Sequence, residues 1–188
     1  MCKACDGKAV IARADEGDPF WYDGGLMTMK ARPSQTGGSI SVVDVRVPKA
    51  KATPLHMHPD AEETIFVIEG DIELHVDGTN HHFGSGTMWT IIRGTPHAFA
   101  VRSAEARMLV VFTPGGGEEF FIEAGEPAER REFPPPAEPD FARYQAAAAK
   151  TGLVMLGPPH STRRTPNCRT HGKDLTFGQT SAQVSGCR

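Results

Sequence analysis

Short runs of alternating apolar and polar residues cover most of the chain, and glycine or proline separates them. In the clearest run, Ile72, Leu74 and Val76 alternate with polar residues and lead into Asp77-Gly78. This alternation has the two-residue period of a strand with one buried face. Because Asp-Gly is a preferred two-residue hairpin turn, a return strand is predicted from Thr79 to Phe83.

Further segments show the same kind of pattern between turn signals. They are 26–31, 39–47, 63–69, 87–92, 97–102 and 106–112. With the hairpin they give about eight short strands, and the spacing of the turn signals is typical of an all-β fold. We therefore predict an antiparallel sandwich or a jelly roll. Residues 1–19 show no clear period and are expected to form an arm.

Helical signals appear only after these strands. Residues Glu118–Ala124 are expected to form one or two helical turns that stop at Gly125, and prolines at 134–136 favour an extended linker. Asp140 is the predicted N-cap of a longer helix that Thr151-Gly152 ends. We expect this C-terminal helix to pack on the outside of the strands or on a partner subunit. A lid over the mouth of the fold is the alternative.

Four side chains at the ends of predicted strands suggest a metal centre. His56 and His58 are two residues apart, so both point to the same face of an extended strand. Glu63 opens the next strand after a short loop, and His97 starts a later strand. Three imidazoles and one carboxylate form a ligand set that divalent transition metals accept.

The spacing of these residues resembles the first sequence motif of the cupin superfamily. That motif, H-x-H-x(3,4)-E-x(6)-G, matches completely over His56–Gly70, with Glu63 rather than Glu62 at the right distance before the glycine. The resemblance covers about residues 20–125. It implies a jelly-roll β-barrel in which His56, His58 and Glu63 are metal ligands.

The second cupin motif, G-x(5)-P-x-G-x(2)-H-x(3)-N, is matched in part. Gly86, Gly94 and His97 stand at its conserved positions. Ile92 stands where proline is usual and Val101 where asparagine is usual. Neither departure touches a ligand, so the resemblance implies that His97 is the fourth one.

The run Thr113–Phe121 resembles the end of single-domain, quercetin dioxygenase-like cupins. This resemblance implies a reaction in which the enol or phenol oxygen of the substrate coordinates the metal. Glu63 then accepts its proton, and dioxygen attacks the activated carbanion. Glu63 is thus expected to be both a ligand and the general base.

The ligand set itself leaves two open positions on an octahedral metal. We expect one divalent transition metal, Fe, Mn, Ni or Co, in preference to Zn or Cu. Because strand residues alternate between faces, apolar side chains share a face with Glu63 and His97, which predicts an apolar pocket. The side chains expected in this pocket are Ile65, Val67, Trp89, Phe99, Val101 and Phe112.

Two other classes of protein fit the same ligands. An isomerase or lyase would use the metal only as a Lewis acid and would consume no oxygen. A small-molecule-binding cupin without chemistry is the other alternative, although such a module has no need of all four ligands. The preferred hypothesis is a dioxygenase whose partners are a small enolisable or phenolic substrate and O2.

Composition and charge agree with one globular β domain followed by a tail. The chain has 188 residues, 39% of them hydrophobic, with 20 glycines and 15 prolines. The predicted organisation is an arm at 1–19, a β-barrel domain at 20–125, a linker and helix at 126–159 and a tail at 160–188. The tail has five basic residues and one acidic residue among polar ones, so it is expected to be disordered. The acidic remainder of the chain argues against a nucleic-acid partner.

The chain has no apolar run long enough to span a membrane and no secretory signal at its start, so a cytoplasmic protein without a membrane partner is expected. Cysteines at positions 2, 5, 168 and 187 lie near the ends and are expected to be free thiols. His75, His81 and His82 are expected to face solvent. The strand Leu26–Ala31 is expected at a sheet edge that a second subunit covers, which predicts a homodimer.

Overall fold

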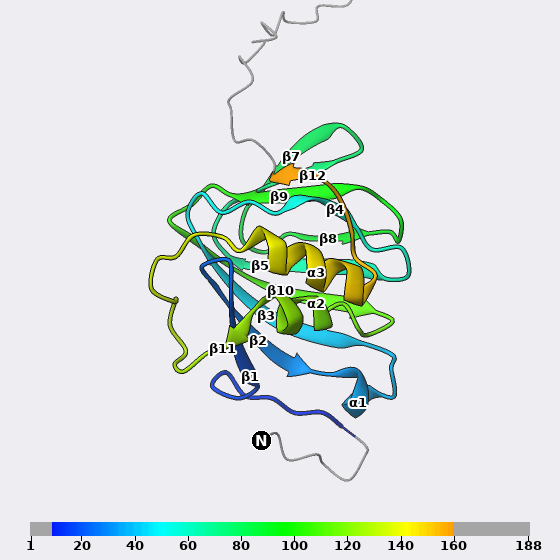
Figure 1. Cartoon of the computed structure of the whole chain (residues 1–188), viewed down its shortest axis with the longest axis vertical. Helices are drawn as coiled ribbons and strands as arrows, with labels where there is room; N and C mark the ends of the chain where they lie inside the picture. Colours follow the sequence, from blue (N-terminus) through cyan, green and yellow to red (C-terminus); the bar gives the residue numbers. More distant parts are fainter. Residues whose placement is uncertain (1–8, 160–188) are drawn as a thin grey trace, which may run out of the picture.

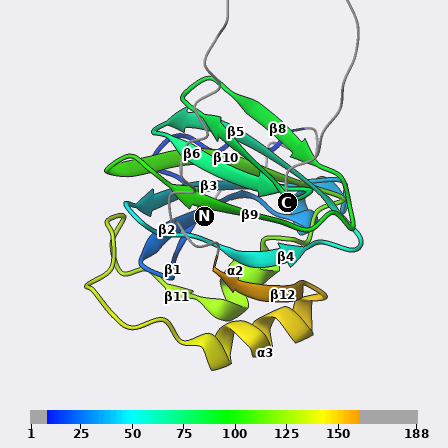
Figure 2. The same ribbon diagram turned by 90° about the horizontal axis from the view of Figure 1, so that it is seen from above.

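The computed structural model describes residues 9–159, which form two antiparallel sheets that face each other (Figure 1, Figure 2). In spatial order, the first sheet contains β11 (Glu126–Pro127), β1 (Asp18–Tyr22), β2 (Gly25–Ala31), β3 (Ser41–Pro48), β10 (Glu105–Thr113), β5 (Glu62–Glu69) and β8 (Met88–Ile91). The second contains β12 (Val154–Pro159), β4 (Pro54–Met57), β9 (His97–Val101), β6 (Ile72–Val76) and β7 (Thr79–Phe83). The predicted all-β jelly roll is confirmed, but its two sheets remain separate and do not close into the expected barrel.

The hydrophobic core lies between the two sheets and follows from the alternation along each strand. In β10, Ala106, Met108, Val110 and Phe112 are buried, and the residues between them are more exposed. The register of β10 against β3 and β5 brings these side chains level with buried valines and isoleucines of the neighbouring strands. A period of two therefore builds one continuous apolar layer, which is the main stabilising feature of the fold.

All the strands expected from the sequence are present within two residues of their predicted ends. The strands β1, β11 and β12 and the short helix α1 (Pro33–Thr36) are additional to the prediction, and β1 begins inside the expected arm. The edge assignment of Leu26–Ala31 was wrong, because β2 lies between β1 and β3. That reason for a homodimer is thus removed, and the dimer itself stays a prediction.

Two hairpins of the fold have the same dipeptide, Asp-Gly, in their turns. Asp23 and Gly24 join β1 to β2, and Asp77 and Gly78 join β6 to β7. All four residues have positive φ angles, of 45° and 77° in the first turn and 50° and 70° in the second. These are the conformations of a two-residue turn whose twist matches the flanking strands.

The C-terminal segment returns to the sandwich after leaving it. Helix α2 (Glu119–Ala124) and helix α3 (Phe141–Thr151) pack on each other, and the carboxylate of Asp140 caps α3 by accepting a hydrogen bond from the backbone N–H of Arg143 (3.0 Å). β12 then pairs with β4, and Met155 lies opposite His56. Figure 2 shows α2, α3 and β12 together on one side of the molecule, next to β4. The expected packing role of this helix is therefore observed.

Several sequence-based expectations concern residues outside the described range. These are the basic tail at 160–188 and the four cysteines. Within residues 9–159, no helix has the length and apolar character needed to cross a membrane.

Gly70, which ends β5, is expected to be a strict requirement of the fold. Its φ is +97°, and a Cβ atom built on it would lie 2.5 Å from the carbonyl oxygen of Glu105. Gly70→Ala should therefore lower the free energy of unfolding by about 3 kcal/mol in a urea titration, because backbone strain and steric overlap add. Gly86→Ala is the matched control, since its φ is +85° but no atom lies within 4 Å of its Cβ position. It should cost only about 1 kcal/mol, and equal costs for the two variants would contradict the steric argument.

Candidate metal centre

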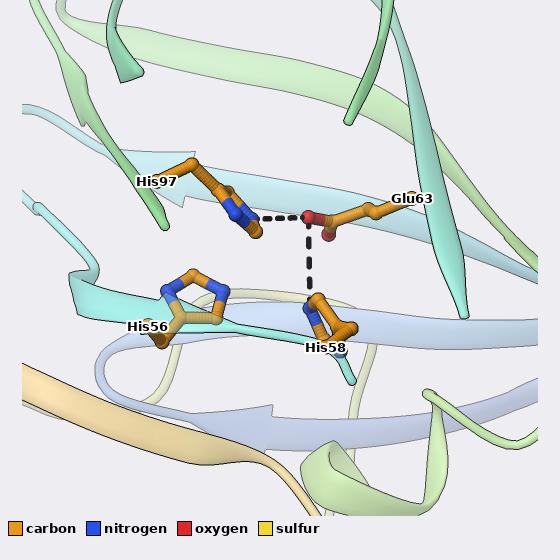
Figure 3. Close-up of side chains that lie close together, drawn as sticks. All are labelled: His56, His58, Glu63 and His97. Atoms are coloured by element: carbon orange, nitrogen blue, oxygen red, sulfur yellow. Dashed lines mark hydrogen bonds and ion pairs between the residues drawn. The ribbon is translucent and has the colours of Figure 1, made fainter. Parts of the chain in front are cut away.

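The four candidate ligands come from both sheets and meet between them (Figure 3). His56 lies in β4 and His58 directly after it, while His97 begins β9 and lies opposite His56 in the ladder. Glu63 projects from β5 of the other sheet. The short loop after His58 lets the chain cross from one sheet to the other, which brings the carboxylate to the imidazoles.

The ligand atoms of these four side chains all lie within 4.8 Å of one another. Oε2 of Glu63 is 2.8 Å from Nε2 of His97 and 3.7 Å from Nε2 of His58. The rings of His56 and His97 are 4.3 Å apart between centroids. The sequence prediction that these residues lie together is therefore met by the geometry.

Backbone carbonyls orient two of the imidazoles. Nδ1 of His56 donates to the carbonyl oxygen of Pro54 at 2.8 Å, and Nδ1 of His97 donates to that of Thr95 at 3.0 Å. A proton held on Nδ1 leaves Nε2 as the nitrogen available for a ligand. Each carbonyl belongs to the residue two positions earlier, so the local backbone geometry fixes both rings.

Burial and mutual charge set the protonation of the cluster. Burial lowers the pKa of His56 to about 4 and also lowers the pKa of His58. Burial acts to raise the pKa of Glu63, but the hydrogen bond from His97 and the nearby histidine charges outweigh it and lower this pKa to about 2. At neutral pH, His56 and His58 are therefore neutral and Glu63 is ionised, which are the states that metal ligands require.

His97 differs from the other two histidines in its protonation. Burial acts to lower its pKa, but the hydrogen bond and the charge of Glu63 outweigh burial and raise it. Nε2 of His97 is hydrogen-bonded to Oε2 of Glu63 at 2.8 Å, across the position where a metal ion would be bound. Binding of a metal would replace this hydrogen bond.

The donor set fits a divalent metal ion. Nε2 of His58 is buried and has no hydrogen-bond partner, which is a costly arrangement unless another group satisfies it. Three nitrogen donors and one carboxylate oxygen suit the ions from Mn to Zn. Other histidines of the described chain lie elsewhere, with His81 and His82 exposed as expected and His75 half-buried against Asn80.

An apolar cavity opens onto the cluster. The space between its walls is about 800 Å³, a volume that includes open solvent at its mouth. His56, His58 and Glu63 form part of its lining, and Phe99 and Phe112 are the two expected pocket residues that line it as well. Four other expected pocket residues are buried in the core beside the cavity, not in its wall: Ile65, Val67, Trp89 and Val101.

Part of the cavity wall comes from segments that the sequence motifs do not include. Tyr22 and Asp23 come from β1 and its turn, and Leu153 and Met155 come from the chain after α3. The Asp23-Gly24 dipeptide is a hairpin signal that would have predicted the first of these. The C-terminal segment therefore both packs on the sandwich and closes one side of the cavity.

Residues 43–112 match the protein family described as the cupin domain. A quercetin 2,3-dioxygenase of Bacillus subtilis (strain 168) is 30% identical over 148 residues, which are 78% of this chain and 44% of that protein. The chain thus spans less than half the length of this relative.

Solved structures show the same fold at low sequence identity. The ectoine synthase from P. lautus has a TM-score of 0.53 and 20% identity, over 69% of this chain and 96% of that one. An RmlC-like cupin from Shewanella frigidimarina has a TM-score of 0.50 and 15% identity, over 58% of this chain and 96% of that one. These structural similarities support a shared fold. At such low sequence identity they say nothing about activity.

Proposed function

Because this chain belongs to the cupin superfamily, we propose that it is a metal-dependent dioxygenase acting on a small enolisable or phenolic, flavonol-like compound with O2. The observation that carries the proposal is the position of the cavity. Its apolar wall ends on three of the four candidate ligands, so a planar substrate in the cavity would present its edge to the metal centre.

We assign the four side chains of the cluster as ligands of one divalent metal, with Fe, Mn, Ni or Co preferred over Zn or Cu. His56, His58 and His97 supply nitrogen and Glu63 supplies oxygen. The ion would supply a Lewis acid that lowers the pKa of a coordinated substrate oxygen. The protein supplies the orientation of the ligands and the apolar surroundings.

Glu63 is the proposed general base. Glu63 is ionised at neutral pH, and it would accept the proton of a substrate hydroxyl whose pKa the bound metal lowers. Oε2 faces the histidines, and we assign the proton to the other oxygen, Oε1. Removal of the proton leaves an electron-rich enolate or phenolate, which is the form that reacts with O2.

The apolar wall has a part in the same reaction. Phe99, Phe112 and Val110 surround the space beside the ligands and offer no hydrogen bond to water. Exclusion of water strengthens the electrostatic effect of the metal centre and protects a carbanion from protonation. The ring of His58 lies 5.3 Å from that of Phe112, so the wall reaches the ligands directly.

A metal-dependent isomerase or lyase is the second candidate, because the same base and the same ligands would serve proton abstraction without O2. Oxygen consumption separates the two. With a panel of flavonols and other enolisable aromatics, we expect uptake of about one O2 per substrate consumed, and none after removal of the metal by a chelator. Substrate consumption without oxygen uptake would favour the isomerase or lyase. Metal binding and tight ligand binding without turnover would indicate a binding module.

A further inference from the structure

Part of the lining of the apolar cavity follows the strands of the larger sheet away from the metal centre. Phe112 lies opposite both Glu63 and Ser41, so it marks the end of the cavity at the metal centre. Val47 also lines the cavity and is six residues further along β3 than Ser41. Val47 therefore lies at a different level along the sheet from the metal centre.

An ion pair lies at the Val47 end. Asp23 is in the turn between β1 and β2, and the start of β2 is level with the end of β3 through the pairing of Leu26 with Arg46. Lys51 follows β3, and the chain then returns along β4 to His56. Five residue steps separate Lys51 from His56, so their backbones are at most about 16 Å apart.

The two side chains of this pair contact each other and also line the cavity. Nζ of Lys51 is 2.9 Å from Oδ1 of Asp23, and the side chains are 30% and 24% exposed. Apart from Glu63 and the histidines of the metal centre, the rest of the lining is uncharged. The cavity therefore has charged groups at both ends and an uncharged, mostly apolar wall between them.

We propose that Asp23 and Lys51 form a second polar subsite, which binds a hydroxyl group of the substrate at the end of the cavity distant from the metal centre. This inference rests on the proposed role of the cavity as a substrate site. An ammonium has three N–H donors and a carboxylate has several acceptor positions, so the mutual contact leaves donors and acceptors unused. A hydroxyl is able to accept from Lys51 and donate to Asp23 at once.

The charge of the pair limits the class of substrate. Lys51 and Asp23 neutralise each other, so the subsite favours a neutral group that is both donor and acceptor. A carboxylate at this end would meet the negative charge of Asp23 and compete with it for Lys51. The expected substrate is thus an elongated, neutral aromatic compound with oxygen functions at both ends.

Calorimetric titration of three biphenyl probes tests the subsite in the protein as purified with its metal. The probes carry one para hydroxyl, a para hydroxyl on each ring, or one hydroxyl and one carboxylate. The two-hydroxyl probe should bind roughly tenfold more tightly than the one-hydroxyl probe, because the second hydroxyl gains hydrogen bonds to charged groups. In Lys51→Met this ratio should fall to about one.

Two further variants complete the test. Lys49→Met, at an exposed residue of the same turn and outside the cavity lining, should keep the tenfold ratio. Asp23→Asn keeps a residue that tolerates positive φ but leaves Lys51 without its counter-charge, so the carboxylate probe should become the tightest ligand. Thermal unfolding would verify that each variant is folded.

The outcomes separate this subsite from the proposed reaction. An unchanged ratio in folded Lys51→Met, or a carboxylate probe that wild type prefers, would overturn the hydroxyl subsite. In the first case the ion pair would only brace the β1–β2 turn. The binding ratios do not require turnover, so a tenfold ratio without oxygen uptake would support the subsite and contradict the dioxygenase.

Discussion

Replacement of both His56 and His97 by alanine is expected to reduce the bound metal from about one equivalent per chain to less than about one tenth. The variant removes two of the four donors. These two are the imidazoles that backbone carbonyls hold in place. Two remaining donors leave a divalent ion mostly hydrated and weakly held. Elemental analysis of untagged protein after dialysis is the measurement, and oxygen uptake should be lost with the metal.

A matched double variant controls for the loss of histidines as such. His81→Ala/His82→Ala removes two exposed imidazoles of β7, outside the cluster, and should leave metal content unchanged. Thermal unfolding would show whether the His56→Ala/His97→Ala variant is still folded. A folded variant that keeps its full equivalent of metal would refute the assignment of these two ligands.

Glu63→Gln is expected to lower kcat by about 10²-fold to 10⁴-fold while part of the metal is retained. Glutamine has nearly the same shape as glutamate, so the packing of this buried position is preserved. A neutral amide is a weaker ligand, but the three imidazoles remain. It is a poor proton acceptor, which removes the proposed base. The rate should therefore be compared per bound metal ion, at saturating substrate.

The neighbouring residue provides the control for this substitution. Glu62 is partly exposed and forms an ion pair with Arg93 (2.6 Å) instead of facing the cluster. Because adjacent residues of a strand point to opposite faces, Glu62→Gln should change turnover by less than about twofold. Full activity in Glu63→Gln, or loss of activity in Glu62→Gln alone, would mean that the base has been misassigned.

The candidate ligands could be predicted because short-range geometry relates His56 to His58 and because the resemblance to the cupin motifs implies Glu63 and His97. The spacing of His56 and His58 places both on one face of a strand, and the turn glycines fix where the next strands start. Likewise, the Asp77-Gly78 hairpin was predicted from two residues. The equivalent Asp23-Gly24 hairpin was missed because the strand before it has no clear alternation, with four partly buried residues in succession after the exposed Asp18.

The pocket was harder to predict because alternation gives the face of a side chain and not its place along the sheet. Ile65 and Val67 share a face with Glu63, as expected. They lie further along β5, however, and are buried in the hydrophobic core. The cavity wall instead includes Leu153 and Met155, which reach it through the pairing of β12 with β4. That pairing joins residues about a hundred positions apart, and no local pattern encodes such a contact.

The position of a strand within its sheet was also hard to predict from local sequence. The segment Leu26–Ala31 has the pattern of a strand, which the structure confirms. Its place in the sheet depends on whether another strand pairs with it, and β1 does. Closure of the barrel is a further property of this kind, since it depends on the pairing of the last strands of each sheet and not on their individual patterns.

X-ray absorption at the K edge of the bound metal, measured on untagged wild-type protein, tests the central claim most directly. If the four side chains hold the ion, the spectrum should show nitrogen and oxygen donors at about 2.0–2.2 Å with the multiple-scattering signature of about three imidazoles. A shell of sulfur donors at about 2.3 Å would place the metal on cysteines instead. A spectrum without imidazole, or protein without metal, would contradict the proposed centre.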